Sequence, residues 1–141
     1  MTYFPDLSTF MYWPQTKKIS VVQVGWLERG HDFPVDTPSD EFLTALLWCC
    51  NHARAKQTRG IHSCDFCDVG DIWYPTHRNK VGKSVLGSAE IWIPFQGKIF
   101  AAPDLVYHYV SAHHYLPPSE FIDAVINLKI SGNILPEEIT S

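Results

Sequence analysis

The sequence predicts an α+β fold in which a small antiparallel sheet packs against about three helices. Two observations lead to this fold class. First, β-branched and aromatic residues, which favour extended backbone, are concentrated in three short runs. These runs lie at residues 19–27, 89–93 and 98–101. Second, apolar residues recur at helical spacing in three longer segments. These segments lie at residues 38–50, 104–114 and 118–130.

Size and composition indicate one folded unit. The chain has 141 residues, of which 45% are hydrophobic, 13% aromatic and 18% charged. A chain of this kind can bury one core, so we interpret residues 1–141 as a single domain. The net charge of -4 argues against nucleic acid as a partner, because phosphate binding depends on dense Lys and Arg. Two modest basic clusters, at residues 54–59 and 78–83, are interpreted as solvated loops.

The sequence shows no targeting or membrane segment. It opens with Met-Thr-Tyr-Phe-Pro-Asp, without the basic stretch and apolar run of a secretory signal. No apolar stretch reaches the length that spans a bilayer. We therefore expect a cytoplasmic protein with no membrane partner. In that reducing compartment the four cysteines are expected to be thiols or metal ligands, not disulfides.

The N-terminal part is predicted to be extended. Residues 1–18 are rich in aromatic residues and proline, so we expect an arm that lies on the body of the domain. Its apolar side chains are expected to pack on the domain's own core or, as the alternative, to form a partner surface. The segment from Ile19 to Leu27 is then predicted to form a strand.

The first helix is predicted from its start signals and its apolar face. Thr37 can cap the helix, and Pro38 suits the first helical position. The apolar face is made by Phe42, Leu43, Leu46, Leu47 and Cys50. Cys49 and Cys50 are therefore interpreted as residues of the helix core, not as chemically active thiols.

The middle of the chain alternates between segments with weak and with strong signals of secondary structure. A polar segment at 51–60 follows the first helix. Residues 68–83 are interpreted as an irregular excursion, without regular secondary structure, because Gly, Pro and charged residues interrupt the aromatic residues. The runs at 89–93 and 98–101 are joined by Pro94-Phe-Gln-Gly97, which predicts a hairpin.

Two further helices are predicted after the hairpin. Pro103 and Asp104 open the first of them, which is expected to continue to about His114. Pro118 opens the second, which is expected to run to about Ile130 and to end at Gly132.

A metal site is predicted from cysteine and histidine spacing. Cys64-Asp-Phe-Cys67 places two thiols on one tight turn, and the later helix carries His108 and His113. Together these four residues are the donor set of a tetrahedral zinc site, which would be structural because all four ligands come from the protein. Two residues five apart on a helix point about 140° apart, so His62 is kept as a substitute for one of the two histidines.

The order of a cysteine turn, a hairpin and a ligand-bearing helix resembles treble-clef zinc modules. Thioredoxin-like, deaminase and hydrolase motifs are not matched. The remaining enzymatic alternative is a metal-dependent nucleic-acid-processing enzyme on a treble-clef scaffold. His77 and Asn79 would then be catalytic, whereas a basic loop is the simpler interpretation of this segment.

Several longer motifs stand out along the chain. They include the Val24-Gly-Trp-Leu strand, the segment from Gln57 to Cys67, Glu90-Ile-Trp-Ile-Pro and the Tyr-His-Tyr-Val helix with its later His113. In these motifs the chain resembles a family of small uncharacterised bacterial proteins. The resemblance covers nearly the whole chain except residues 68–88. It implies that the cysteines and histidines of the proposed site belong to one recurring pattern, and it implies no activity.

Together these observations predict a zinc-stabilised cytoplasmic module that binds a protein partner. Small acidic bacterial proteins without a catalytic set include immunity and antitoxin proteins, so a toxin-neutralising role is the specific form that we expect. No catalytic residues are predicted on this interpretation.

Overall fold

The structure is a computed structural model. It describes residues 3–12, 18–55, 64–66, 72–75, 83–86 and 89–136. The strands in these ranges are β1 (Thr9–Tyr12), β2 (Ile19–Gln23), β3 (Arg54–Ala55), β4 (Ile72–Pro75), β5 (Lys83–Leu86), β6 (Glu90–Phe95) and β7 (Lys98–Pro103). The helices are α1 (Asp40–His52), α2 (Val106–His113) and α3 (Ser119–Ser131). The α+β class is confirmed.

The main sheet has five strands in the order β1-β2-β7-β6-β3. The predicted hairpin is present as β6 and β7, which pair antiparallel around a turn at Gln96 and Gly97. The sequence predicted a small antiparallel sheet, whereas the observed sheet is mixed because β2 and β7 run parallel. A parallel pair needs a long crossover connection, and the chain between these two strands is long enough to include α1.

The N-terminal segment contains a strand that the sequence pattern did not predict. Thr9–Tyr12 pairs antiparallel with β2 and forms one end of the main sheet. Pro5 lies before this strand and Pro14 after it, so the prolines that suggested an unpaired arm only bracket it. β2 itself is shorter than expected and ends at Gln23, because Gly25 adopts a positive φ of 78°.

Two other regions hold more strand than their sequences indicated. The polar segment after the first helix includes β3, which pairs with β6 over only two residues. The region interpreted as an irregular excursion includes β4, which pairs antiparallel with β5 in a separate two-stranded sheet, and β5 begins at the last residue of that region. Short strands of this kind give too little alternation for a periodic signal, so their pairing is set by neighbouring backbone.

The helices begin and end close to the expected positions, with one different cap. Ser39, not Thr37, caps α1, and its hydroxyl accepts a hydrogen bond from the backbone N–H of Phe42 at 3.1 Å. α3 starts after Pro118 and stops at Gly132, whose φ is 71°, as the sequence predicted. α2 begins at Val106, because Asp104 and Leu105 form the turn that leads into it.

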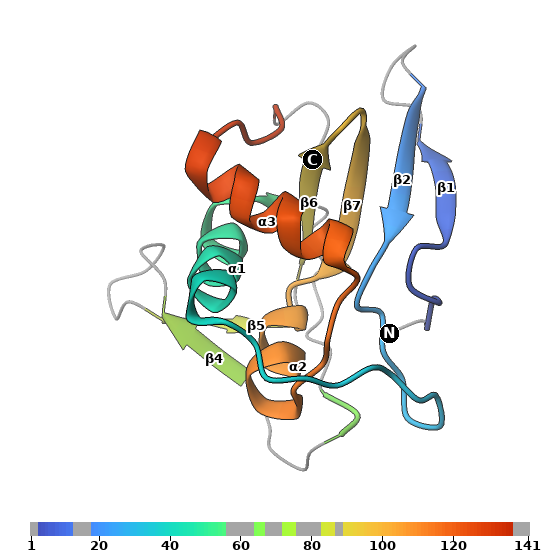
Figure 1. The fold of residues 1–141 in the computed structure, drawn as a ribbon, viewed down its shortest axis with the longest axis vertical. Coiled ribbons are helices and arrows are strands. Elements are labelled where there is room, and N and C mark those ends of the chain that lie inside the picture. Colours follow the sequence, from blue (N-terminus) through green and yellow to red (C-terminus); the bar gives the residue numbers. More distant parts are fainter. Residues whose placement is uncertain are drawn as a thin grey trace.

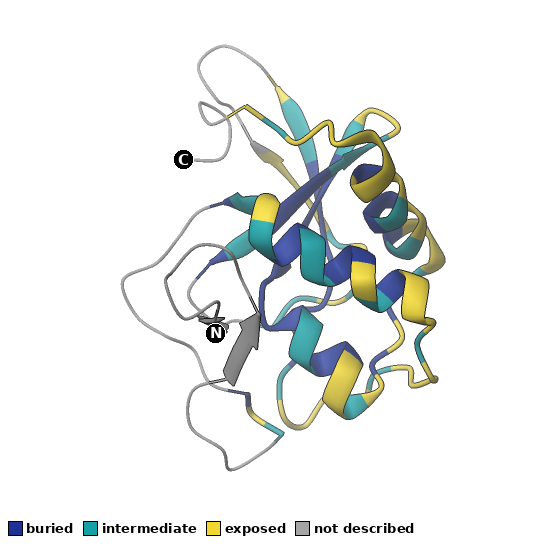
Figure 2. Cartoon of the chain, turned by 90° about the vertical axis from the view of Figure 1, so that its left-hand side faces the viewer, coloured by how far each residue is buried: buried dark blue, intermediate teal, exposed yellow. Residues whose placement is uncertain are grey.

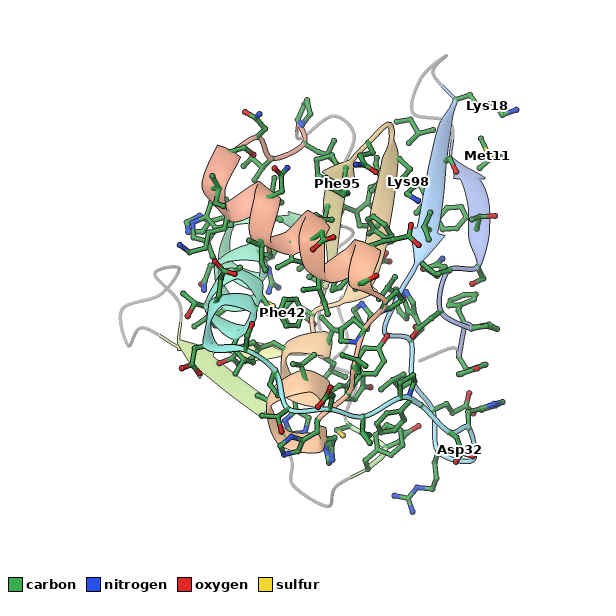
Figure 3. The ribbon with its side chains drawn as sticks, in the orientation of Figure 1. Met11, Lys18, Asp32, Phe42, Phe95 and Lys98 are labelled. Carbon is green, nitrogen blue, oxygen red and sulfur yellow. The ribbon has the colours of Figure 1, made fainter. Side chains whose placement is uncertain are left out.

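The helices lie on one face of the main sheet, with α2 near one end (Figure 1). Successive residues of β2 contribute to opposite faces, as strand geometry requires: Val22 joins the core with the helices, and Val21 belongs to a second buried cluster with Trp92 and Ala101. Buried residues line the inner sides of the helices, whereas their outer sides are exposed (Figure 2). Figure 3 shows Phe42 directed from α1 into this interior, where it is buried. Cys49 and Cys50 are also fully buried, as predicted.

A hydrogen-bonded junction ties the N-terminal segment to the end of α2. The Tyr115 hydroxyl donates to Asp6 Oδ2 at 2.7 Å, and the Gly25 N–H donates to Asp6 Oδ1 at 3.0 Å. A Cβ at Gly25 would lie 2.9 Å from Val106 Cγ2, so only glycine allows this approach without a shift of α2. The start of α2 is therefore fixed against the loop that follows β2.

A buried ion pair joins β3 to the turn before α2. Arg54 Nη1 lies 3.1 Å from Asp104 Oδ2, and the Asp104 side chain is fully buried. The Asp104 backbone N–H donates to the Ala89 carbonyl, so this aspartate is held through its main chain as well. The pair fixes the position from which α2 starts.

Candidate metal centre

Three potential metal ligands come together from two distant parts of the chain. Cys64 lies in the described turn of residues 64–66, and His108 and His113 lie on α2. One donor atom from each residue can be chosen so that all three lie within 4.8 Å of one another. The Cys64 Sγ and His113 Nε2 atoms are 3.4 Å apart. Cys64 is buried and both histidines are half-buried, so the group lies just below the surface.

Both histidines of α2 reach this point. His108 is the third residue of the helix and His113 is the last. The two rings meet edge to face, with centroids 4.9 Å apart. His114 then takes a left-handed conformation with a φ of 57°, and its N–H bonds the Tyr109 carbonyl. The two side chains therefore meet, although residues five apart on a helix point about 140° apart.

The electrostatic surroundings favour a bound cation. Burial lowers the pKa of His108, and the nearby His113 lowers it further. A lowered pKa keeps the imidazole neutral near pH 7, which is the form that binds a metal. His113 is the last residue of α2 and so lies at the negative pole of the helix dipole, which attracts positive charge.

The cysteine is supported by its own turn. The backbone N–H of Phe66 donates to Cys64 Sγ over 3.4 Å. A hydrogen bond to sulfur favours the thiolate, the form of cysteine that binds metal ions. One thiolate and two imidazoles form a set of donors that could hold a metal ion.

The structure describes only part of the predicted site. It brings Cys64, His108 and His113 together, whereas Cys67 and the substitute ligand His62 lie outside the described residues. His77 and Asn79, the catalytic candidates of the enzymatic alternative, also lie outside them. The hairpin precedes α2 as in the treble-clef order, but His113 is at the end of the helix instead of near its start.

Sequence reasoning missed the residues that surround the cysteine turn. Arg29 and Phe33 come from the loop after β2, and they contact Asp65 and Phe66 respectively. No local spacing or motif links residues 29–33 to residues 64–66. The only signal in the sequence was the aromatic character of Phe33 and Phe66, which many core residues share.

The fold and this group of residues define a class, an α+β domain with a potential Cys/His/His metal site on a short helix. Comparison with family profiles gives the identification: the chain belongs to the family described as a domain of unknown function (DUF7919), which matches residues 2–126. Comparisons with curated proteins and with solved structures found no match. In the part of the chain that the structure describes, no helix combines the length and the apolar character needed to cross a bilayer.

Proposed function

We propose that this protein is a zinc-stabilised module that binds a protein partner in the cytoplasm. The observation that carries the zinc assignment is the convergence of Cys64, His108 and His113. Zinc accepts thiolate and imidazole ligands together and prefers four of them in structural sites. Cys67 is the proposed fourth ligand because it follows Phe66 directly and completes the two-residue cysteine spacing.

The zinc ion would act as a cross-link in the fold. Cys64 and His113 are separated by 49 positions in the sequence, so a shared ion closes a long loop. Closing such a loop removes conformational freedom from the unfolded chain and stabilises the folded one. The ion would hold the cysteine turn against α2.

The support for a binding role lies at the β1 end of the main sheet. Phe10 and Met11 are 39% and 44% exposed, and Leu7, just before the strand, is 40% exposed. Figure 3 shows Met11 at this outer edge, away from the helices. Exposed apolar side chains on an end strand are typical of surfaces that pair with another protein. A toxin protein is the specific partner that we propose, by analogy with small acidic neutralising proteins.

The zinc assignment is tested by metal content. Protein purified without a metal-affinity tag is analysed for metals, beside Cys64→Ser, His108→Ala and the control His52→Ala, which removes an exposed histidine of α1. We expect about one zinc per chain in the native protein and the control. We expect loss of zinc and a lower thermal midpoint in the two site variants. A stably folded native protein without zinc, even after zinc is added and excess removed, would contradict the proposal.

A further inference from the structure

The two residues between the cysteines are both held by side chains from the rest of the fold. Asp65 is held through its backbone carbonyl. Arg29 Nε donates to that carbonyl at 3.0 Å, and Arg29 Nη2 donates to the same oxygen. Arg29 lies in a tight turn in which the His31 N–H bonds the Glu28 carbonyl. Two donors of one rigid guanidinium therefore fix one carbonyl of the cysteine turn.

Phe66 is held by aromatic rings from two other elements. Its ring meets Phe33 edge to face, with centroids 5.2 Å apart and planes at 65°. It meets Tyr109 of α2 in the same way at 5.9 Å, and it lies 5.7 Å from the ring of His113. Edge-to-face contacts at these distances are favourable and directional. They fix Phe66 between the loop after β2 and the helix that carries the histidines.

We infer that Arg29 and Phe66 are positioning residues that hold the cysteine turn in its metal-binding geometry and so set the affinity for the ion. This inference rests on the proposed zinc site. A turn that is already ordered loses less conformational freedom when it binds, so its affinity is higher than that of a free loop. Residues that orient ligands in this way typically change metal affinity by about 10–100-fold when they are removed.

Arg29 offers the cleaner test of the two. Its side chain is exposed and bonds the turn through donors alone, so its replacement leaves no hole in the core. Phe66 is half-buried, and its loss would remove aromatic packing together with any effect on the ligands. Arg29→Met keeps the apolar part of the side chain and removes the donors. Arg29→Lys restores one charged donor group.

The matched control is Lys129→Met. Lys129 is an exposed cation in the last turn of α3, and its replacement removes one positive charge at a distance from the cysteine turn. The control separates a change in net charge from the loss of the bond to Asp65. An effect of net charge alone would also change the affinity of Lys129→Met. Loss of a positive charge close to the ion would strengthen cation binding, so a weaker affinity in Arg29→Met cannot come from charge.

The measurement is the affinity of metal-stripped protein for Co²⁺, which has visible absorption when it is bound tetrahedrally. We expect Arg29→Met to weaken Co²⁺ binding at least tenfold, with Arg29→Lys in between and Lys129→Met unchanged. The urea midpoint of metal-free Arg29→Met should equal that of the metal-free native protein. A merely structural role of Arg29 would instead lower the midpoint of the variant. If Arg29→Met does not fold, Arg29→Lys carries the test through its own loss of affinity relative to the native protein.

Two results have different meanings. Native protein that binds no Co²⁺ would overturn the proposed zinc site, and the role of Arg29 with it. Native protein that binds Co²⁺, together with an Arg29→Met or Arg29→Lys variant of equal affinity, would overturn the positioning role alone.

Discussion

Replacing Arg54 with Met should destabilise the protein strongly, because it removes a guanidinium that pairs with the buried Asp104 carboxylate. The Asp104 side chain is fully buried and the Arg54 side chain is only 10% exposed. Removing one partner of a buried pair typically costs about 3–5 kcal/mol. Met fills a similar volume, so little of this loss comes from an empty space. With a typical urea dependence of about 2 kcal/mol per molar, the midpoint should fall by about 1.5–2.5 M.

A matched control is available in an exposed ion pair. Lys98 Nζ and Glu120 Oε2 form an ion pair of 2.9 Å, but the two side chains are 33% and 51% exposed. Exposed pairs contribute at most about 1 kcal/mol, so Lys98→Met should move the urea midpoint by no more than about 0.5 M. Both variants are compared with the native protein at the same zinc concentration, with unfolding followed by circular dichroism. Equal losses in the two variants would refute the argument that burial, not distance, sets the cost.

Two further predictions concern the β1 surface and the buried thiols. If β1 binds the partner, Phe10→Ser combined with Met11→Ser should abolish binding in a titration with the purified partner. The control Ile130→Ser, at a 79% exposed position on α3, should leave binding unchanged. Equal loss of binding in both variants would place the contact elsewhere. Burial raises the pKa of Cys49 from 9.0 to about 12, so above pH 9 its thiol ionises in the unfolded chain before it does so in the folded one. The folded state then binds more protons, and stability should fall as pH rises from 9 toward 12. Urea unfolding at pH 8 and pH 10.5 should show a smaller fall for Cys49→Ala, and an identical pH dependence would contradict this assignment.

The parts of the fold that the sequence predicts well are those with strong local chemistry. α3 is bracketed by Pro118 and Gly132, which begin and end a helix for reasons contained in their own backbones. The hairpin is likewise marked by a turn between two β-type runs. β3 shows the opposite case, because its two residues become a strand only where β6 offers free backbone groups. The parallel pairing of β2 and β7 also depends on a contact between distant segments, which no local pattern encodes.

The residues of the candidate site also fall into those that local sequence predicts and those that it does not. Cysteine and histidine are uncommon residues with few roles, so their spacing alone suggested that Cys64, His108 and His113 could share an ion. Arg29 and Phe33 have many roles in proteins, and they lie far from the cysteine turn in the sequence. Their contacts with this turn could be found only after the loop that follows β2 had been placed beside it.

The geometry of α2 resolves the main objection to a shared ion. Residues five apart on a helix point about 140° apart, which would place His108 and His113 on different sides of a long helix. α2 nevertheless brings the two rings together, with centroids 4.9 Å apart, and one donor atom of each lies within 4.8 Å of the other and of Cys64 Sγ. The chain reverses after α2, and the N–H of Tyr115 bonds the same Tyr109 carbonyl that accepts from His114. The left-handed His114 ends the helix directly after its second histidine, so the chain turns away from the helix axis at this point.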